Sequence, residues 1–407
     1  SIFYDLIPLL KPENYLDSNR EFKQFYLSRL DLLNEVSCLL SISNSSSKEA
    51  EKYLSIDKKD IHNIYAGCDQ STFYPSKLIE DSNKTKYSLG KYILYSGAGD
   101  PRKNIQRLVV AYSLLAKDLI WNYKLVLVGK LLPEEISLIK SWITSVNLTE
   151  NHIVLLGYVS DDELASLYRN CTLFVFPSLH EGFGLPALEA MSCGAVVLAS
   201  NSTSIPEVIQ NEDALFDPTN VSEITSLITK ALTNESFFNS LSAKALKNSL
   251  HFSWDRTAEL TKTALNNTIK NSNKAKKIKF NMESIIQSKK NNYQLILHNI
   301  TNILQENNFL SNDEAYLKKL AASINLIEIN SNYFKQFQTD ANVPFSWQVE
   351  GPFDSNYSLA ILNREFSIAL HKIIPNTTIL STEGHGDYDP DLDFIKNNSN
   401  IYKLYND

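Results

Sequence analysis

The stretch FPSLHEGFGLPALEAMSCG, which runs from Phe176 to Gly194, carries the most informative pattern in this sequence. An apolar and aromatic run that is typical of a buried strand ends at Phe176, and a glycine-containing loop follows from His180 to Gly184. A helix is expected to begin near Pro186, because proline suits the first helical turn. The start of a helix presents free backbone N–H groups and the positive end of the helix dipole. The pattern therefore predicts a binding site for pyrophosphate.

The sequence around this stretch, from Lys91 to about Phe216, alternates short apolar runs with helical patterns. In the helical segments, apolar residues recur at three- and four-residue spacing. The strand candidates are Lys91–Ser96, Tyr123–Val128, His152–Leu156, Thr172–Phe176 and Ala195–Ala199. The helical candidates between them are Ile105–Ala116, Glu134–Thr144 and Asp161–Tyr168. This alternation predicts a parallel sheet with helices on both faces and a ligand at the carboxyl ends of the strands.

Two glutamates are expected at this edge of the sheet. Glu181 lies in the loop, and Glu189 follows in the helix. Because ionised carboxylates accept hydrogen bonds strongly, one acid could bind sugar hydroxyls and the other a ribose. The alternative is that Glu181 is only stabilised by the helix dipole and that Glu189 is a solvated helix residue. The flanking glycines and the proline favour the binding function.

The segment EGFGLPALEAMSCG resembles the signature of glycosyltransferase family 4, in which two glutamates separated by seven residues flank a Gly-Phe-Gly turn. The similarity extends from Ser1 to about Leu265. It implies an α/β protein of GT-B type, with two Rossmann-like domains of doubly wound parallel sheets. It also implies a nucleotide-diphosphate sugar as donor and retention of the anomeric configuration. The donor contacts expected from the residues and the resemblance together are Gly97, Tyr158, Val159, His180, Phe183, Gly184, Leu185 and Glu189.

Two adjacent cations, Arg102 and Lys103, lie in the segment SGAGDPRKN that follows the first strand of this domain. A helix start is unfavourable for positive charge, so a bound anion is expected to compensate there. Cations at this edge can neutralise the charge of a departing diphosphate. In the family, the lysine at the Lys103 position contacts the donor phosphates, and we expect Arg102 to share that role. Together with Glu181 they are the predicted catalytic residues, while Asp100 is expected to cap the helix.

Other segments that resemble the family contribute weaker expectations. In LLGYVSDDEL, Tyr158 and Val159 are candidates for contacts with the nucleobase, or are ordinary packing residues at a strand end. Glu207 is expected to have a structural or capping role, and Trp254 to pack. In YDLIPLL near the start, Tyr4 stands where many family members have histidine, so Asp5 is the remaining acceptor-side candidate.

The pattern divides the chain into five segments. Residues 1–80 are expected to form the C-terminal part of a GT-B acceptor-side domain, with strands at Val36–Ile42 and Ile61–Ile64. Residues 81–250 are expected to form a donor-binding domain. A helix crossing back to the first domain (251–270) and a helical linker (271–343) follow. The segment WQVEGPFDSNYSLAILNRE (Trp347–Glu365) resembles the beginning of another family 4 first domain, so 344–407 is expected to start a second one. This order predicts a fragment of a tandem bacterial glycosyltransferase.

Composition excludes several other classes of protein. The net charge of −7, with acidic and basic residues interspersed, argues against a nucleic-acid surface. Four scattered cysteines indicate neither a zinc site nor a disulfide framework. The acids Asp387 and Asp389 match a DxD metal motif formally, but Leu392 occupies the position of the EF-hand glycine and a solvated loop is favoured. No metal and no cofactor are therefore expected.

These observations predict a glycosyltransferase that moves a hexose or deoxyhexose onto a glycan or lipid-linked acceptor, with retention and without a metal. The alternative is a non-catalytic nucleotide-sugar-binding or scaffold segment of a tandem polysaccharide-synthesising enzyme. No apolar run approaches the roughly 20 residues of a membrane span. The expected location is the cytoplasm, with peripheral association at the inner face of the membrane as a further alternative.

Overall fold

The computed structural model describes residues 1–34, 36–75, 87–272, 347–351, 358–374, 377–381 and 398–406. The described residues up to Ile269 and those from Trp347 onward belong to one compact unit. Among all of them, no helix has both the length and the apolar character needed to cross a membrane. The expected linker 271–343 lies outside the described residues except for its first two positions, and the acidic loop around Asp387 lies outside them too.

The donor-side region is built on a six-stranded parallel sheet with the order β6-β5-β4-β7-β8-β9. Its strands are β4 (Tyr92–Ser96), β5 (Lys124–Val128), β6 (Ile153–Gly157), β7 (Leu173–Phe176), β8 (Val197–Ser200) and β9 (Leu215–Phe216). Five of them confirm the strand candidates with ends shifted by one or two residues, and β9 is additional. The strand order reverses at β4, which lies between β5 and β7. Ligands of open α/β sheets bind beyond the carboxyl ends of the strands at such a reversal.

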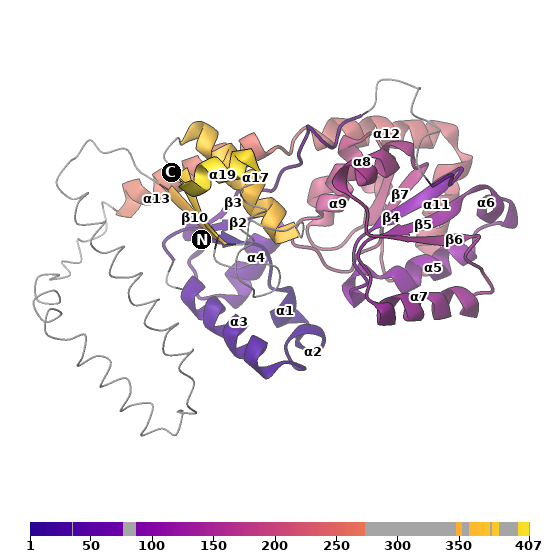
Figure 1. The fold of residues 1–407 in the computed structure, drawn as a ribbon, viewed down its shortest axis with the longest axis horizontal. Coiled ribbons are helices and arrows are strands. Elements are labelled where there is room, and N and C mark those ends of the chain that lie inside the picture. The colour runs from indigo at the N-terminus through magenta and orange to yellow at the C-terminus, as the bar shows by residue number, and fades with distance from the viewer. Residues whose placement is uncertain are drawn as a thin grey trace, which may run out of the picture. The chain divides into compact units, whose positions relative to one another are not determined.

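Helices cover both faces of this sheet, with α5 and α7 on one side and α8, α9 and α12 on the other (Figure 1). The helices of this region are α5 (Ile105–Ser113), α6 (Lys117–Asn122), α7 (Pro133–Ser145), α8 (Asp161–Asn170), α9 (Leu185–Ser192), α10 (Ile205–Ile209), α11 (Val221–Thr233) and α12 (Glu235–Ser249), with the 3-10 turns η3 (Pro101–Lys103) and η4 (Glu212–Ala214). The central strands β4, β5, β7 and β8 are almost completely buried, as their continuous apolar sequences predict, whereas the edge strand β6 is half-buried.

The first residues form a smaller parallel sheet, β1-β2-β3, with its own apolar cluster around Phe3 and Leu39. Its elements are β1 (Ile2–Phe3), α1 (Ile7–Leu10), α2 (Pro12–Tyr15), α3 (Arg20–Leu33), β2 (Leu39–Ser41), α4 (Asn44–Tyr53), η1 (Lys58–Asp60) and β3 (Ile61–Asn63). The two strands expected in this region are present but shorter than predicted.

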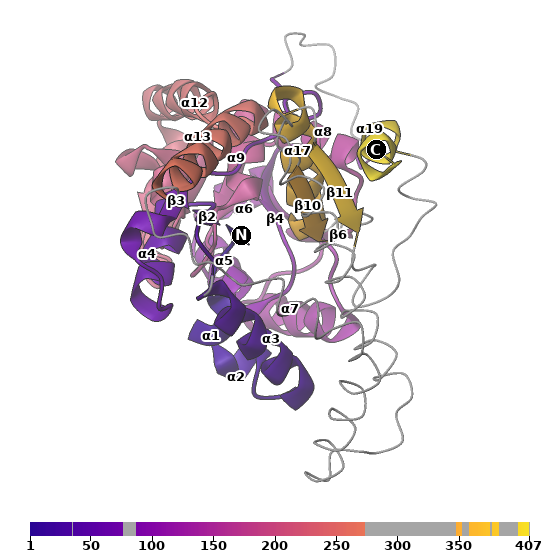
Figure 2. The ribbon, with the colours of Figure 1, turned by 90° about the vertical axis from the view of Figure 1, so that its left-hand side faces the viewer.

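The long helix α13 (Trp254–Ser272) begins beside the segment that follows β3. Ser253 forms a parallel β-bridge with Cys68, and the ring of Phe252 contacts that of Tyr65 edge to face. Trp254 is buried there, which confirms its packing role. The remaining elements are β10 (Trp347–Gly351), α17 (Ser358–Ile373), β11 (Thr377–Ser381) and α19 (Ser399–Asn406). β10 and β11 pair in parallel (Figure 2), so β10, α17 and β11 form a strand-helix-strand unit. The sequence-based domain bounds stay a prediction.

Candidate active site

Two loops meet at the strand reversal. One follows β4 and contains Arg102, and the other follows β7 and contains His180. The backbone N–H of Leu179 donates to the carbonyl of Arg102 (2.7 Å), and the Asn104 amide donates to the carbonyl of Pro177 (3.0 Å). The loops are therefore joined by hydrogen bonds as well as by the pairing of β4 with β7.

The central feature is a buried carboxylate held by two cations. Glu181 Oε1 lies 2.6 Å from Lys103 Nζ, and Oε2 lies 2.8 Å from Arg102 Nη1. The same guanidinium donates to the carbonyl of His180 (3.0 Å). Lys103 is 8% exposed and Glu181 7% exposed, so this pair is shielded from water, whereas the Arg102 side chain is partly exposed. The structure thus brings together the three predicted catalytic residues, from positions 78 and 79 residues apart in the chain.

The electrostatics of this cluster keep the carboxylate ionised. Burial by itself would raise the pKa of Glu181, but Lys103 and Arg102 outweigh it and lower the pKa below its usual value. Burial would likewise lower the pKa of Arg102, whereas Glu181 and Asp100 raise it. The site is a set of charges that compensate one another.

Arg102 and Lys103 belong to the short turn η3, and α5 begins only at Ile105, so the expected basic helix start is a 3-10 turn. Asp100 accepts from the backbone N–H of Arg102 (2.9 Å), which confirms its capping role for this turn. Gly97 directly follows β4, and its N–H donates to the carbonyl of Val128 at the end of β5 (2.9 Å).

Helix α9 starts at Leu185 with Gly184 as its N-cap, at φ +108°, a conformation that favours glycine. No side chain caps this helix, and Ser204 is hydrogen-bonded to the carbonyls of Glu181 (2.8 Å) and Phe183 (2.9 Å). Ser204 therefore stabilises the loop through two of its carbonyl groups. The backbone N–H groups at the helix start remain available to an anion. Ser204 is the N-cap residue of α10, and its contacts with this loop were not predicted from the sequence.

Glu189 lies on α9 and accepts a hydrogen bond from the hydroxyl of Tyr168 (3.2 Å). Burial raises the pKa of Glu189 to about 7, against the opposing effect of Tyr168. It is thus not the solvated helix residue of the alternative interpretation. Its contact with a ribose stays a prediction.

The candidates for nucleobase contacts follow β6, two strands from β4. Tyr158 is 61% exposed, whereas Val159 is 6% exposed and packs in the core. The structure therefore places them apart from the Arg102 and Glu181 cluster, at the same edge of the sheet.

Asp5 follows β1 and accepts from the backbone N–H of Ile7 (3.0 Å). Burial raises its pKa, while the Ile7 N–H and Arg102 oppose the shift. Glu49 of α4 was not predicted at all, yet its Oε1 lies 2.8 Å from Nε2 of His180. Nothing in the local sequence of a polar helix distinguishes this glutamate.

Glu207 of α10 accepts from the backbone N–H groups of Asn44 and Ser45, both at 2.9 Å. It caps the start of α4, so the predicted structural or capping role is confirmed. The capped helix belongs to the first region of the chain, 162 and 163 residues away in sequence.

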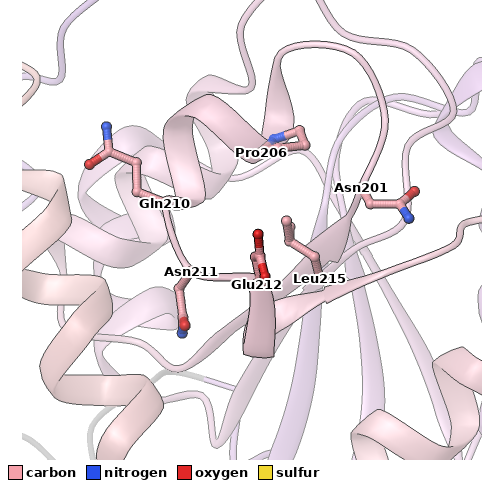
Figure 3. A pocket seen from close by; sticks show the side chains of 6 residues that line it. All are labelled: Asn201, Pro206, Gln210, Asn211, Glu212 and Leu215. Carbon is pink, nitrogen blue, oxygen red and sulfur yellow. The ribbon is translucent and has the colours of Figure 1, made fainter.

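A separate pocket lies beside α10 and η4 (Figure 3). Its lining is Asn201, Pro206, Gln210, Asn211, Glu212 and Leu215. This lining contains one carboxylate and no cation, so it offers little to a diphosphate.

Comparison with known proteins places the chain in a family. Residues 77–248 match the model described as glycosyl transferases group 1. O-antigen chain mannosyltransferase B of Escherichia coli is 32% identical over 262 residues, which cover 64% of this chain and 68% of the relative. The chain belongs to the group 1 glycosyltransferases. The serotype-specific mannosyltransferase WbdA of Escherichia coli is 43% identical over 263 residues, but the chain spans only about a third (32%) of its length.

Solved structures show the same fold. Sucrose-phosphate synthase from Thermosynechococcus elongatus has a TM-score of 0.56 at 22% identity, over 66% of this chain and 67% of that one. Anabaena Alr3699/HepE in complex with UDP-glucose has a TM-score of 0.54 at 20% identity, over 65% and 70%. The predicted GT-B type α/β fold is confirmed.

Proposed function

We propose that the protein transfers mannose, or a related hexose or deoxyhexose, from a nucleoside-diphosphate sugar to a glycan or lipid-linked acceptor. The observation that carries this proposal is the buried Glu181 carboxylate between Lys103 and Arg102, at the strand reversal of a GT-B sheet. The names of the mannosyltransferase relatives support mannose. We further propose that the enzyme is a family 4 member that retains the anomeric configuration.

Donor binding follows from exchange of ionic partners. A diphosphate carries more negative charge than one carboxylate, so it competes with Glu181 for Arg102 and Lys103. The backbone N–H groups of Phe183, Gly184 and Leu185 add an anion-binding helix start. Once its cations turn to the phosphates, Glu181 is free to accept hydrogen bonds from hydroxyls of the sugar.

Catalysis then rests on the leaving group. Negative charge grows on the diphosphate as the bond to the sugar breaks, and Arg102 and Lys103 are held where they stabilise that charge. Glu181 is assigned to the hydroxyls of the sugar and Glu189, which is hydrogen-bonded to Tyr168, to the ribose, so neither is assigned as a nucleophile. We therefore propose front-face transfer without a metal, in which the departing phosphate accepts the proton of the acceptor hydroxyl.

Glu189 is assigned to the ribose. With a pKa near 7 its carboxyl group is partly protonated at neutral pH, so it can both donate to and accept from a hydroxyl. Cytoplasmic location, peripheral membrane association and a role in polysaccharide synthesis are part of the same proposal.

A thermal-shift panel of nucleoside diphosphates and their mannose, glucose and rhamnose conjugates tests the proposal. A ligand at one hundred times its dissociation constant should stabilise the protein by about 2.7 kcal/mol. The stabilising sugar nucleotide should then lose its sugar in the presence of a mannoside acceptor, and NMR of the product should show the donor's anomeric configuration. Absence of stabilisation by every nucleotide, together with absence of sugar transfer, would contradict the proposal.

A further inference from the structure

A second polar cluster lies next to Arg102, and the proposed donor binding and catalysis assign no role to it, although the sequence predicts His180 as a donor contact. Its members are Asp5 after β1, Tyr26 on α3, Glu49 on α4 and His180 in the loop after β7. Nε2 of His180 is 2.8 Å from Oε1 of Glu49, and the two side chains are only 14% and 13% exposed. Asp5 is within electrostatic range of His180, Glu49 and Arg102, and Tyr26 is within range of Asp5 and Glu49. Asp5 also lies against the loop of His180, since a Cβ at Gly182 would be 2.8 Å from Asp5 Oδ2, so Asp5, Glu49 and His180 lie together and Tyr26 is close enough to be affected by both acids.

Both carboxylates of this cluster are fixed by the backbone. Glu49 Oε2 accepts from the N–H of Leu6 (3.2 Å), and Asp5 Oδ1 accepts from the N–H of Ile7 (3.0 Å). Each therefore directs its other oxygen elsewhere, Oε1 of Glu49 toward His180 and Oδ2 of Asp5 toward the loop of Gly182. A Cβ at Gly182 would lie 2.8 Å from Asp5 Oδ2, so only glycine permits this approach.

Two polar atoms of the cluster are buried without a hydrogen bond in the described part of the chain. They are the hydroxyl of Tyr26 and Nε2 of His180, whose short distance to Glu49 lacks hydrogen-bond geometry. Burial, followed by the charges of Asp5 and Glu49, raises the pKa of Tyr26 against the opposing effect of the Leu9 backbone, so its hydroxyl keeps the proton and can donate. Burying unpaired polar atoms costs free energy, and a ligand that pairs with them recovers it.

We propose that this cluster binds hydroxyl groups of the acceptor sugar, with Tyr26 as donor, His180 as a second contact and Glu49 as the positioning residue for the imidazole. The inference rests on the proposed function, which puts the donor diphosphate on Arg102. Sugar hydroxyls both donate and accept, and the cluster offers a phenol, an imidazole and a carboxylate oxygen. Three of the four side chains come from the first region of the chain, opposite the donor loops. Since Arg102 donates to the carbonyl of His180 (3.0 Å), a hydroxyl bound here lies beside the donor.

Tyr26→Phe is the sharpest test, because it removes only one oxygen atom. The hydroxyl donates to no acceptor in the described structure, so a purely structural role predicts no loss of Tm and no change in kinetics. We expect an unchanged Tm and an increase in KM for methyl α-mannoside of about three- to tenfold, the range for one lost hydrogen bond. Donor hydrolysis without acceptor and binding of the nucleoside diphosphate should stay the same. Tyr53→Phe, at an exposed position on α4, is the matched control.

Glu49→Gln should raise the KM for the same acceptor, whereas Glu51→Gln, which carries an exposed carboxylate of the same helix, should not. Binding of methyl α-mannoside is also followed by ligand-observed NMR with nucleoside diphosphate present, so that the test does not depend on turnover. The proposed acceptor subsite would be wrong if Tyr26→Phe bound methyl α-mannoside as well as the wild type does. It would also be wrong if the variant lost only donor binding, or if the wild type did not bind the acceptor. If the wild type binds no nucleotide at all, the proposed function itself fails.

Discussion

Replacement of Lys103 by methionine isolates the charge that the proposed mechanism needs. Methionine keeps most of the length of the side chain and removes the ammonium group, whose Nζ lies 5.4 Å from the centroid of the Phe176 ring. Glu181 would keep its second cation, because Arg102 Nη1 lies 2.8 Å from Oε2. The variant should therefore fold, unlike one that leaves a buried charge with no partner.

The expected loss follows from the role of the lysine in the transition state. Removing one charged or hydrogen-bonding group that stabilises a developing oxyanion lowers turnover by about two to three orders of magnitude, or about 2.7–4 kcal/mol. The effect should appear mainly in kcat, because the charge on the leaving diphosphate grows as the bond breaks. Lys103 is almost fully buried beside Glu181, so solvent screening should not weaken the effect.

The assay is single-turnover transfer from the sugar nucleotide that the thermal-shift panel selects. Lys117→Met, on the exposed surface of α6, is the control and should match the wild type. Circular dichroism and Tm establish that the Lys103 variant is folded. Wild-type turnover by a folded Lys103→Met that still binds the donor would refute the phosphate role of this lysine.

Three further predictions concern glutamates. Glu189→Gln should weaken binding of the free nucleoside diphosphate, whereas Glu181→Gln should spare it and weaken only the sugar nucleotide. Equal affinity of both variants for the free diphosphate, measured by calorimetry, would contradict this assignment. Because burial raises the pKa of Glu189 to about 7 from a usual 4.5, the folded state holds this proton more tightly than the unfolded state. Its contribution to stability should therefore fall as pH rises from about 4.5 to 7, by up to about 3 kcal/mol, and then stay level. Urea unfolding of the wild type and Glu189→Gln at pH 5 and 7.5 should show this difference, and an identical gap at both values would exclude it. Glu207→Ala removes the acceptor of two N–H groups at the start of α4 and should cost about 0.5–2 kcal/mol of unfolding free energy, with the exposed Glu212→Ala as control. No change relative to that control would show that the cap is dispensable.

Much of the donor-side fold could be predicted from sequence because its signals are local. A buried parallel strand such as Tyr92–Ser96 needs a continuous apolar run, and a glycine at 184 followed by Pro186 determines where a helix begins. For the same reason the sequence predicts that the loop residues Arg102, Lys103 and Glu181 lie at one edge of the sheet. The parallel strands all end at that edge, so each loop after a strand arrives there.

Tertiary structure alone decided which side chains meet. The sequence does not state that β4 lies beside β7, and this pairing is what brings Lys103 to Glu181 across 78 residues. The sequence also does not indicate that Glu49 contacts His180. The sequence pattern of a polar helix is the same whether its glutamate faces water or a second domain. The sequence also left Glu189 open as a solvated residue, whereas its hydrogen bond to Tyr168 and its burial depend on how α8 packs on α9. Periodicity determines which face of an element is apolar, but only the packing of elements that are distant in the chain determines what that face touches.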